Sequence, residues 1–207
     1  MGITTEVVLL ALLEHLELTA VALLLAAILA IPLGIHIARA RFLAGPVLAV
    51  VSAMQTIPSV ALLGFLIPLF GIGTKPAIVA LFLYSLLPIV RNTYTGIEQV
   101  DPAAIEAARG MGMRDRQILF RVTIPQALPV VMAGLRTATV SCVGIATLAA
   151  LIGAGGLGTF IFRGISMLNT PMVLAGAIPA AVLALTLDGL LALVARWITP
   201  VGLRRDP

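Results

Sequence analysis

Charged residues are scarce in this chain. They make up 11% of its 207 residues, whereas hydrophobic residues make up 60%. An ordinary soluble domain has roughly 25% charged residues. A water-soluble fold of this length could not bury so much apolar surface, so the composition excludes a soluble globular domain and indicates a protein embedded in a membrane.

Cysteine and lysine are almost absent. The single cysteine, Cys142, cannot form an intrachain disulfide, and we expect it to be a small buried hydrophobic residue. The single lysine lies in Gly73-Thr74-Lys75-Pro76, which lacks the Gly-Lys-Ser/Thr sequence of a phosphate-binding loop. We therefore expect this chain to leave any ATP hydrolysis to another subunit.

Long apolar runs are what the sequence has instead. Crossing the hydrocarbon core of a bilayer takes about 20 mostly apolar residues in a helix. Backbone amides find no water inside lipid, so each run should be helical, and no alternating pattern typical of a barrel strand occurs. The predicted fold is all-α with five membrane spans. The runs are residues 18–38, 46–70, 76–95, 128–152 and 173–195.

The placement of arginine predicts the orientation, because Lys and Arg in short loops are retained on the cytoplasmic side. With the amino terminus outside and the carboxyl terminus inside, eleven basic residues fall on the inner side, and only Lys75 and Arg163 fall outside. The eleven are Arg39, Arg41, Arg91, Arg109, Arg114, Arg116, Arg121, Arg136, Arg196, Arg204 and Arg205.

The predicted organisation is simple. We expect residues 1–17, which are apolar but acidic, to be an interfacial lead-in and not a secretory signal, whose start would be basic. Residues 18–197 form the transmembrane domain, with a long inner loop at residues 98–126, and residues 198–207 form a cytoplasmic tail. The arginines lack the interleaved aromatic residues of a nucleic-acid-binding surface, so we expect them to contact anionic lipid.

The long inner loop has its own helical pattern. Asp101 before Pro102 is typical of a helix start, with a carboxylate cap and proline at the first helical position. Alanines follow, whose small side chains let another protein approach closely, and Gly110 and Gly112 interrupt the helix. A second amphipathic helix is expected to end at Pro125. The pattern predicts a compact docking element beneath the membrane.

Part of this loop resembles a known motif. The sequence Glu106-Ala107-Ala108, followed by Gly112 and by Val122-Thr123-Ile124-Pro125, resembles the EAA loop in the permease subunits of binding-protein-dependent ABC importers. The resemblance implies a coupling helix that rests in a groove of a cytoplasmic ATPase and transmits its closure to the spans. The implied coupling residues are Ile105, Glu106, Ala107, Ala108, Arg109, Gly110, Met111 and Gly112.

A second resemblance covers nearly the whole chain. Residues 55–97 and 151–165 resemble the osmoprotectant branch of these permeases, which take up glycine betaine, carnitine, choline and related quaternary amines. It implies a multi-pass type I ABC importer permease in a prokaryotic inner or plasma membrane. The implied partners are ABC ATPases, which would hold ATP and Mg, a second permease subunit, and an extracytoplasmic binding protein. No cofactor is expected on this chain.

Aromatic residues bear on where the solute would be selected. A quaternary ammonium is generally recognised by an aromatic cage. The chain offers only Trp197, Tyr84 and Tyr94, and Trp197 lies at the predicted inner end, where interfacial tryptophan is common. We therefore expect selective capture on the separate binding protein.

Polar or helix-breaking residues inside the spans are candidates for the translocation path. Pro58, Pro68, Pro88 and Pro179 are expected to interrupt spans and free backbone groups. Asp188 is an acid within the last run. It bonds to a neighbouring helix, lies near the inner interface, or contacts a cationic solute. The candidate path residues are Gln55, Thr56, Pro58, Ser59 and Asp188.

Two further patterns in the sequence could suggest a nucleotide site and a metal site, but neither is complete. Gly153, Gly155 and Gly158 match G-x-G-x-x-G but follow a predicted membrane helix, so we expect close packing of helices or of a docked partner there, and no nucleotide. His15 and His36 are isolated, so no metal site is expected.

Other functions remain open from the sequence. A secondary transporter or channel subunit would need its own ion-coupling or pore chemistry, for which Asp188 is the only candidate, and it would leave the inner loop unexplained. An ABC permease for another solute, such as an amino acid, is also possible. An intramembrane enzyme would need a paired nucleophile and base or a metal motif. No catalytic residue is expected.

Overall fold

The fold is helical throughout the part of the chain that the computed structural model describes, residues 4–199. This confirms the predicted all-α class. The elements are α1 (Thr5–Arg39), α2 (Arg41–Thr56), α3 (Ser59–Phe70), α4 (Thr74–Glu98), α5 (Pro102–Gly110), α6 (Asp115–Ile118), the π-helix η1 (Leu119–Thr123), α7 (Ile124–Ala146), the 3-10 helix η2 (Thr147–Ile152), α8 (Gly158–Ser166) and α9 (Thr170–Ile198).

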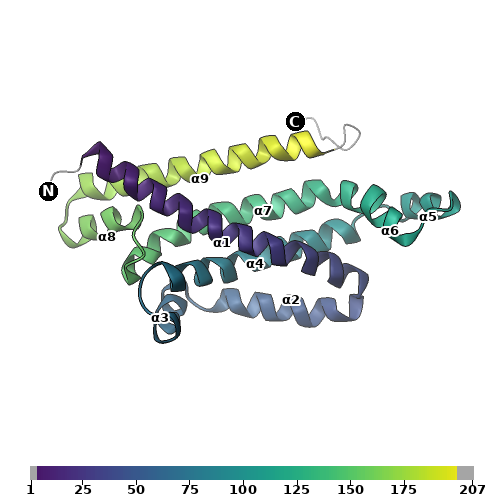
Figure 1. The fold of residues 1–207 in the computed structure, drawn as a ribbon, viewed down its shortest axis with the longest axis horizontal. Coiled ribbons are helices and arrows are strands. Elements are labelled where there is room, and N and C mark those ends of the chain that lie inside the picture. Colours follow the sequence, from purple (N-terminus) through teal and green to yellow (C-terminus); the bar gives the residue numbers. More distant parts are fainter. Residues whose placement is uncertain (1–3, 200–207) are drawn as a thin grey trace.

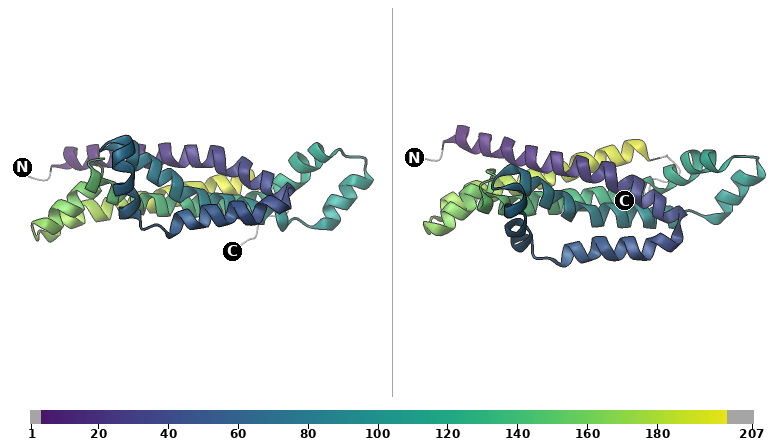
Figure 2. Two further views of the ribbon diagram at one scale, coloured as in Figure 1. Left: turned by 90° about the horizontal axis from the view of Figure 1, so that it is seen from below. Right: turned by 60° about the horizontal axis from the view of Figure 1, so that its bottom comes forward.

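The long helices lie roughly parallel along one axis, with α1, α4 and α7 in the middle, α9 along one side and α2 along the other (Figure 1). The segment made of α5 and α6, which we call the protrusion, projects beyond the bundle at one end (Figure 2). Helices α3 and α8 and the amino terminus lie at the opposite end. Residues far apart in the sequence therefore share one of two ends, and we call them the protrusion end and the α8 end.

Four segments are long and apolar enough to cross a membrane: α1, α4, α9, and the continuous run of helix from Asp115 to Ile152. Helices α2 and α3 pass the same test only as a pair, and they are bent by 96° relative to each other. The expectation of one helical span over residues 46–70 is therefore wrong. The structure has a broken segment there, and residues 4–199 contain four candidate spans, or five when the broken pair is included.

Small residues on α1 bring the central helices together. Ala22, Ala26, Ala30 and Gly34 recur every four residues, which places them on one face of the helix, and the three alanines have no solvent exposure. A Cβ atom added to Gly34 would lie 2.6 Å from the Cβ atom of Thr93 on α4, closer than two carbons can pack. Close backbone approach of this kind is how membrane helices gain packing energy without a hydrophobic driving force.

Proline breaks the chain at only one of the four expected places. Pro58 lies at the bend between α2 and α3, whereas Pro68, Pro88 and Pro179 lie inside α3, α4 and α9, which continue past them. The helix predicted to end at Pro125 also continues. A π-turn precedes this proline, with the amide of Ile124 donating to the carbonyl of Leu119, and α7 runs on.

The expected lead-in has no boundary of its own. Its described residues, from Thr5 onwards, are the first part of α1, which continues unbroken to Arg39. At 1.5 Å per residue this helix is about 50 Å long, more than a hydrocarbon core of about 30 Å requires. The interfacial position of the lead-in stays a prediction, as does the cytoplasmic tail, whose residues 200–207 lie outside the described part.

Candidate functional site

The protrusion begins with a capped helix and ends in a turn that needs glycine. Asp101 accepts a hydrogen bond from the amide of Ala103 at 2.9 Å, and Pro102 starts α5, as expected. At the other end, Gly112 has φ +79°, and the amide of Met113 donates to the carbonyl of Ala108 at 3.1 Å while that of Gly112 donates to Arg109 at 2.9 Å. These two bonds form a Schellman motif, which satisfies carbonyls left free at a helix end.

The expected coupling residues divide into two groups on the protrusion. Ala108 is only 1% exposed, and Ile105 packs against a small cluster formed by Val100, Ala127 and Val131. These two positions hold α5 onto its own subunit. The outward-facing ones are Glu106, Ala107, Arg109, Gly110, Met111 and Gly112. The exposed surface of α5 thus carries one carboxylate, one guanidinium and small or flexible side chains. The helix itself lies beyond the end of the bundle (Figure 2).

A second polar arrangement joins the break between α2 and α3 to helix α4. Pro88 has no N–H, so the carbonyl of Tyr84 lacks its usual partner one turn later. The side-chain amide of Gln55 donates to that carbonyl at 2.8 Å, and the hydroxyl of Tyr84 donates to the carbonyl of Ile57 directly before Pro58. The break between α2 and α3 therefore supplies a donor for the carbonyl that Pro88 leaves free. Helix α4 in turn supplies a donor for the carbonyl before Pro58.

The neighbouring candidate path residues lie at the same break. Thr56 ends α2, with its hydroxyl donating to the carbonyl of Ala53 at 2.7 Å, Pro58 precedes α3, and Ser59 begins it. Gln55, Thr56 and Pro58 are exposed on this subunit. The structure thus brings four of the five candidate path residues together. Tyr84, which the sequence suggested only as a scarce aromatic, completes the group.

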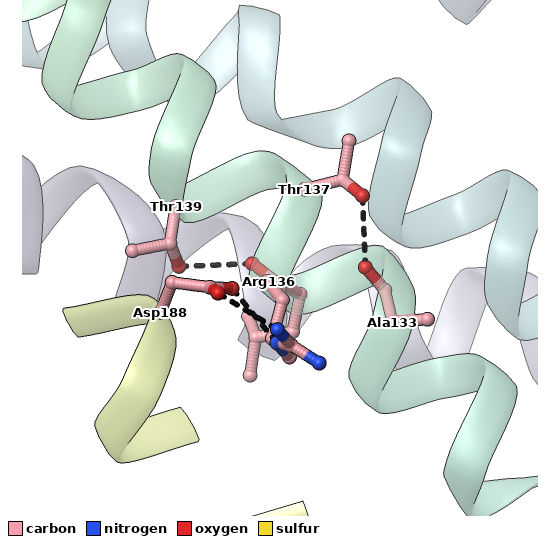
Figure 3. A network of polar contacts seen from close by, with 6 residues as sticks. Ala133, Arg136, Thr137, Thr139 and Asp188 are labelled. Atoms are coloured by element: carbon pink, nitrogen blue, oxygen red, sulfur yellow. Dashed lines mark hydrogen bonds and ion pairs between the residues drawn. The ribbon is translucent and has the colours of Figure 1, made fainter. Parts of the chain in front are cut away.

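Asp188 does not join that group, because it pairs with Arg136 on α7 (Figure 3). The Nε and Nη2 atoms of Arg136 donate to the two carboxylate oxygens of Asp188, both at 2.7 Å. Of the roles expected for Asp188, the bond to a neighbouring helix is therefore present. The sequence shows one base in the fourth apolar run and one acid in the fifth, but it does not show that the two residues pair.

At the α8 end, polar groups of α1 fix the glycine-rich segment. The carboxylate of Glu14 accepts a hydrogen bond from the amide of Gly156 at 2.8 Å. The Nε2 atom of buried His15 lies 3.0 Å from the carbonyl of Val143. This carbonyl is free of its usual helical partner because α7 changes to the 3-10 helix there, and the backbone amide of Thr147 donates to the carbonyl of Gly144 instead. A Cβ atom on Gly158 would lie 1.9 Å from the carbonyl oxygen of Thr147. Glycine at this position therefore allows segments of the same subunit to pack closely.

The described arginines that were expected on the inner side gather at the protrusion end, with two exceptions. The junction of α1 and α2, the protrusion and the last turn of α9 hold six of the nine described inner-side arginines, and Arg121 lies in η1. Arg41 pairs there with Glu98 at 3.1 Å. Arg91 and Arg136, however, lie inside α4 and α7, so counting them as loop charges was wrong. Lys75 and Arg163 lie on elements at the α8 end.

The fold is shared with chains of ABC transporters of known structure. The structure superposes on a chain of the inward-facing MetNI methionine ABC transporter with a TM-score of 0.85 and 24% identity, covering 97% of this chain and all of that one. It also superposes on a chain of an amino acid ABC transporter crystallised with histidines, with a TM-score of 0.73 and 22% identity, covering 95% of this chain and 99% of the other. At these identities the likeness shows the fold alone.

The chain belongs to the family described as binding-protein-dependent transport system inner membrane component, whose model matches residues 30–200. It is therefore a multi-pass membrane protein of a transport system. It is 49% identical over 196 residues to the osmoprotectant import permease protein OsmW of Salmonella typhimurium, covering 92% of this chain and 91% of the relative.

Two relatives come from Bacillus subtilis. The chain is 47% identical over 191 residues to the glycine betaine/carnitine/choline transport system permease protein OpuCB, covering 92% of this chain and 88% of that one. It is 45% identical over 192 residues to the choline transport system permease protein OpuBB, covering 93% and 88% of the two chains. The expected family, on its osmoprotectant side, is thus confirmed by sequence relatives of nearly full length.

Proposed function

We propose that this chain is the permease subunit of an ABC importer for small osmoprotectants that carry a quaternary ammonium group. The observation that carries the proposal is the 45–49% identity, over nearly the full length, to permeases named for osmoprotectant, choline, carnitine or glycine betaine transport. The chain would form the translocation path and leave solute capture and ATP hydrolysis to other subunits.

The partners follow from what this subunit offers. An exposed helix at the protrusion end, α5, suits a groove in a cytoplasmic ATPase. The exposed polar break between α2 and α3 suits a path shared with a second permease subunit, identical or not, because a bundle this small cannot enclose a solute path by itself. A separate binding protein would deliver the solute at the α8 end. This assignment puts the amino terminus outside and the protrusion inside.

The proposed mechanism is alternating access driven from the protrusion. Closure of two ATPases on ATP would move α5, and the continuous helix from Asp115 to Ile152 would carry that movement into the bundle. The π-turn at Leu119–Thr123, which lies between α6 and α7, is a natural place for the movement to be absorbed. ATP then shifts the population between inward-facing and outward-facing states.

Membership in this family favours the importer over a secondary transporter or channel. An amino acid as solute has weaker support, because the amino acid transporters are similar to this chain at only 22–24% identity. The solute class therefore follows the closer sequence relatives.

The test is ATP-driven uptake in proteoliposomes. The chain is reconstituted with its companion ATPase and binding protein, and uptake of radiolabelled glycine betaine is measured with ATP inside the vesicles. We expect uptake with the complete complex and none when the ATPase is omitted or cannot hydrolyse ATP. Uptake by this chain alone would overturn the proposal in favour of a secondary transporter.

A further inference from the structure

The ion pair between Arg136 and Asp188 lies far from the ends of the helices that carry it. Asp188 is ten residues before the end of α9 at Ile198, and Arg136 is ten residues before the end of α7 at Ala146. At 1.5 Å per residue, each is about 15 Å from that helix end. Charged residues at such depth are costly in a membrane unless each finds a partner or water. Here the bidentate pairing at 2.7 Å satisfies both.

The pair is also open to the surroundings of the subunit. The side chains of Arg136 and Asp188 keep 39% and 28% of their exposure, and they line a cavity of about 410 Å³. The other lining residues are Ala133, Thr137, Val140 and Ser141. The cavity therefore presents two charged groups and two hydroxyl-bearing side chains, Thr137 and Ser141, at one place on the surface of the subunit.

The rest of the exposed surface nearby is of a different kind. Several exposed positions of α9 are large and apolar, as contact with membrane lipid requires, and Leu185 is one turn before Asp188. These positions include Leu174, Ile178, Val182 and Leu185. The cavity on α7 instead shows small and hydroxyl-bearing side chains, and the hydroxyl of Thr137 already donates to the carbonyl of Ala133 at 2.9 Å (Figure 3). The ion pair thus has small and hydroxyl-bearing neighbours on α7 and large apolar neighbours on α9.

We propose that Arg136 and Asp188 form a recognition site for zwitterionic solutes, in which Arg136 binds a carboxylate and Asp188 binds a quaternary ammonium. This inference rests on the proposed function. A solute with both charges can enter between the two side chains and replace each one's partner, so that no charge is left unpaired at this depth. The planar guanidinium, which already holds one carboxylate by two hydrogen bonds, suits a second carboxylate equally well.

The same site should bind a solute with only a positive charge less tightly than a zwitterion. Glycine betaine and carnitine carry a trimethylammonium group and a carboxylate, whereas choline carries a trimethylammonium group and a hydroxyl. Choline could pair with Asp188 only by leaving Arg136 without a partner, which is costly for a charge within a membrane-spanning segment. The site therefore favours the zwitterions over the cation after the binding protein has released either one.

The test compares two solutes on neutralised variants of the complete transporter in proteoliposomes. Radiolabelled glycine betaine and choline are supplied at concentrations that saturate one binding protein able to deliver both. Loss of one charge-assisted interaction corresponds to about tenfold to a hundredfold. In Arg136→Gln, glycine betaine uptake should fall by that factor relative to choline uptake. In Asp188→Asn, choline uptake should fall by more than glycine betaine uptake. The ratio of glycine betaine uptake to choline uptake should therefore fall in Arg136→Gln and rise in Asp188→Asn.

The controls separate recognition from folding. Neutralising the other ion pair, with Arg41→Gln and Glu98→Gln, should leave the ratio unchanged, since Arg41 and Glu98 lie at the protrusion end. The double variant Arg136→Gln with Asp188→Asn leaves no charge unpaired. It replaces the single variants if one of them is not inserted into the membrane in normal amounts. It should lower glycine betaine uptake more than choline uptake. A ratio unchanged in these variants would mean a merely structural pair and overturns the inference. Failure of the wild-type complex to take up either solute would instead refute the proposed function.

Discussion

At the scale of single residues, the irregular backbone of the bundle is satisfied by side chains from distant segments. Gln55 bonds the carbonyl that Pro88 leaves free, Tyr84 bonds the carbonyl before Pro58, and His15 lies beside the carbonyl that η2 leaves free. In lipid, such partners must come from the protein itself. A polar residue that looks isolated in an apolar sequence is thus often the partner of a distant irregularity.

Removing one hydroxyl at the break should slow transport without preventing insertion. In Tyr84→Phe the carbonyl of Ile57 loses its donor, and a single hydrogen bond of this kind contributes about 0.5–1.5 kcal/mol. If the bond holds in only one conformation of the cycle, the uptake rate should change by about two- to tenfold. The measurement is the initial uptake rate at equal amounts of inserted protein.

Tyr94→Phe is the matched control, because no hydrogen bond of the Tyr94 hydroxyl occurs within residues 4–199. We expect Tyr94→Phe to transport at the wild-type rate. Equal rates in Tyr84→Phe and wild type would show that the contact between the break and α4 has no part in the transport cycle.

At the scale of elements, the protrusion was predictable in part. Asp101, Pro102 and Gly112 are residues whose preference is local, so the start of α5 and the turn after it follow from sequence alone. The continuation past Pro125 was not predictable, because it depends on a π-turn that absorbs the missing N–H. The bend at Pro58 and the unbroken helix at Pro88 likewise differ only in their tertiary partners.

A small change at the turn of α5 should uncouple the subunit from its motor. Gly112 has φ +79°, and an added Cβ would meet nothing within 4 Å, so Gly112→Ala acts through the backbone alone. The left-handed conformation costs a residue with a Cβ roughly 1–2 kcal/mol. We expect a severalfold loss of solute-stimulated ATP hydrolysis by the reconstituted complex, with normal membrane insertion.

Gly110→Ala is the control for this substitution. Gly110 also has open space around it, but it lies within α5 and has no positive φ, so alanine is tolerated or favourable there. Coupling should stay at the wild-type level. Equal loss of coupling in both variants would mean that surface chemistry, and not the shape of the turn, limits the contact.

At the scale of the whole molecule, the subunit has two chemically different ends and two separate polar arrangements between them. Arginines gather at the protrusion end, and acidic α1 residues meet the glycine-rich segment at the α8 end. The family and the all-α class could be predicted from the sequence, because composition and the loop motif are local properties. The pairing of Arg136 with Asp188 could not, since it depends on how α7 and α9 pack.

The most direct test of the central claim is a cross-link between the protrusion and the companion ATPase. Single cysteines replace Met111, which is 75% exposed on the protrusion, or Ile72, which is 77% exposed at the α8 end, while Cys142 stays buried. With a reagent that joins cysteine to lysine, we predict an adduct with the ATPase for Met111→Cys and none for Ile72→Cys or wild type. An adduct only from Ile72→Cys, or none from Met111→Cys in a complex that transports, would contradict the account.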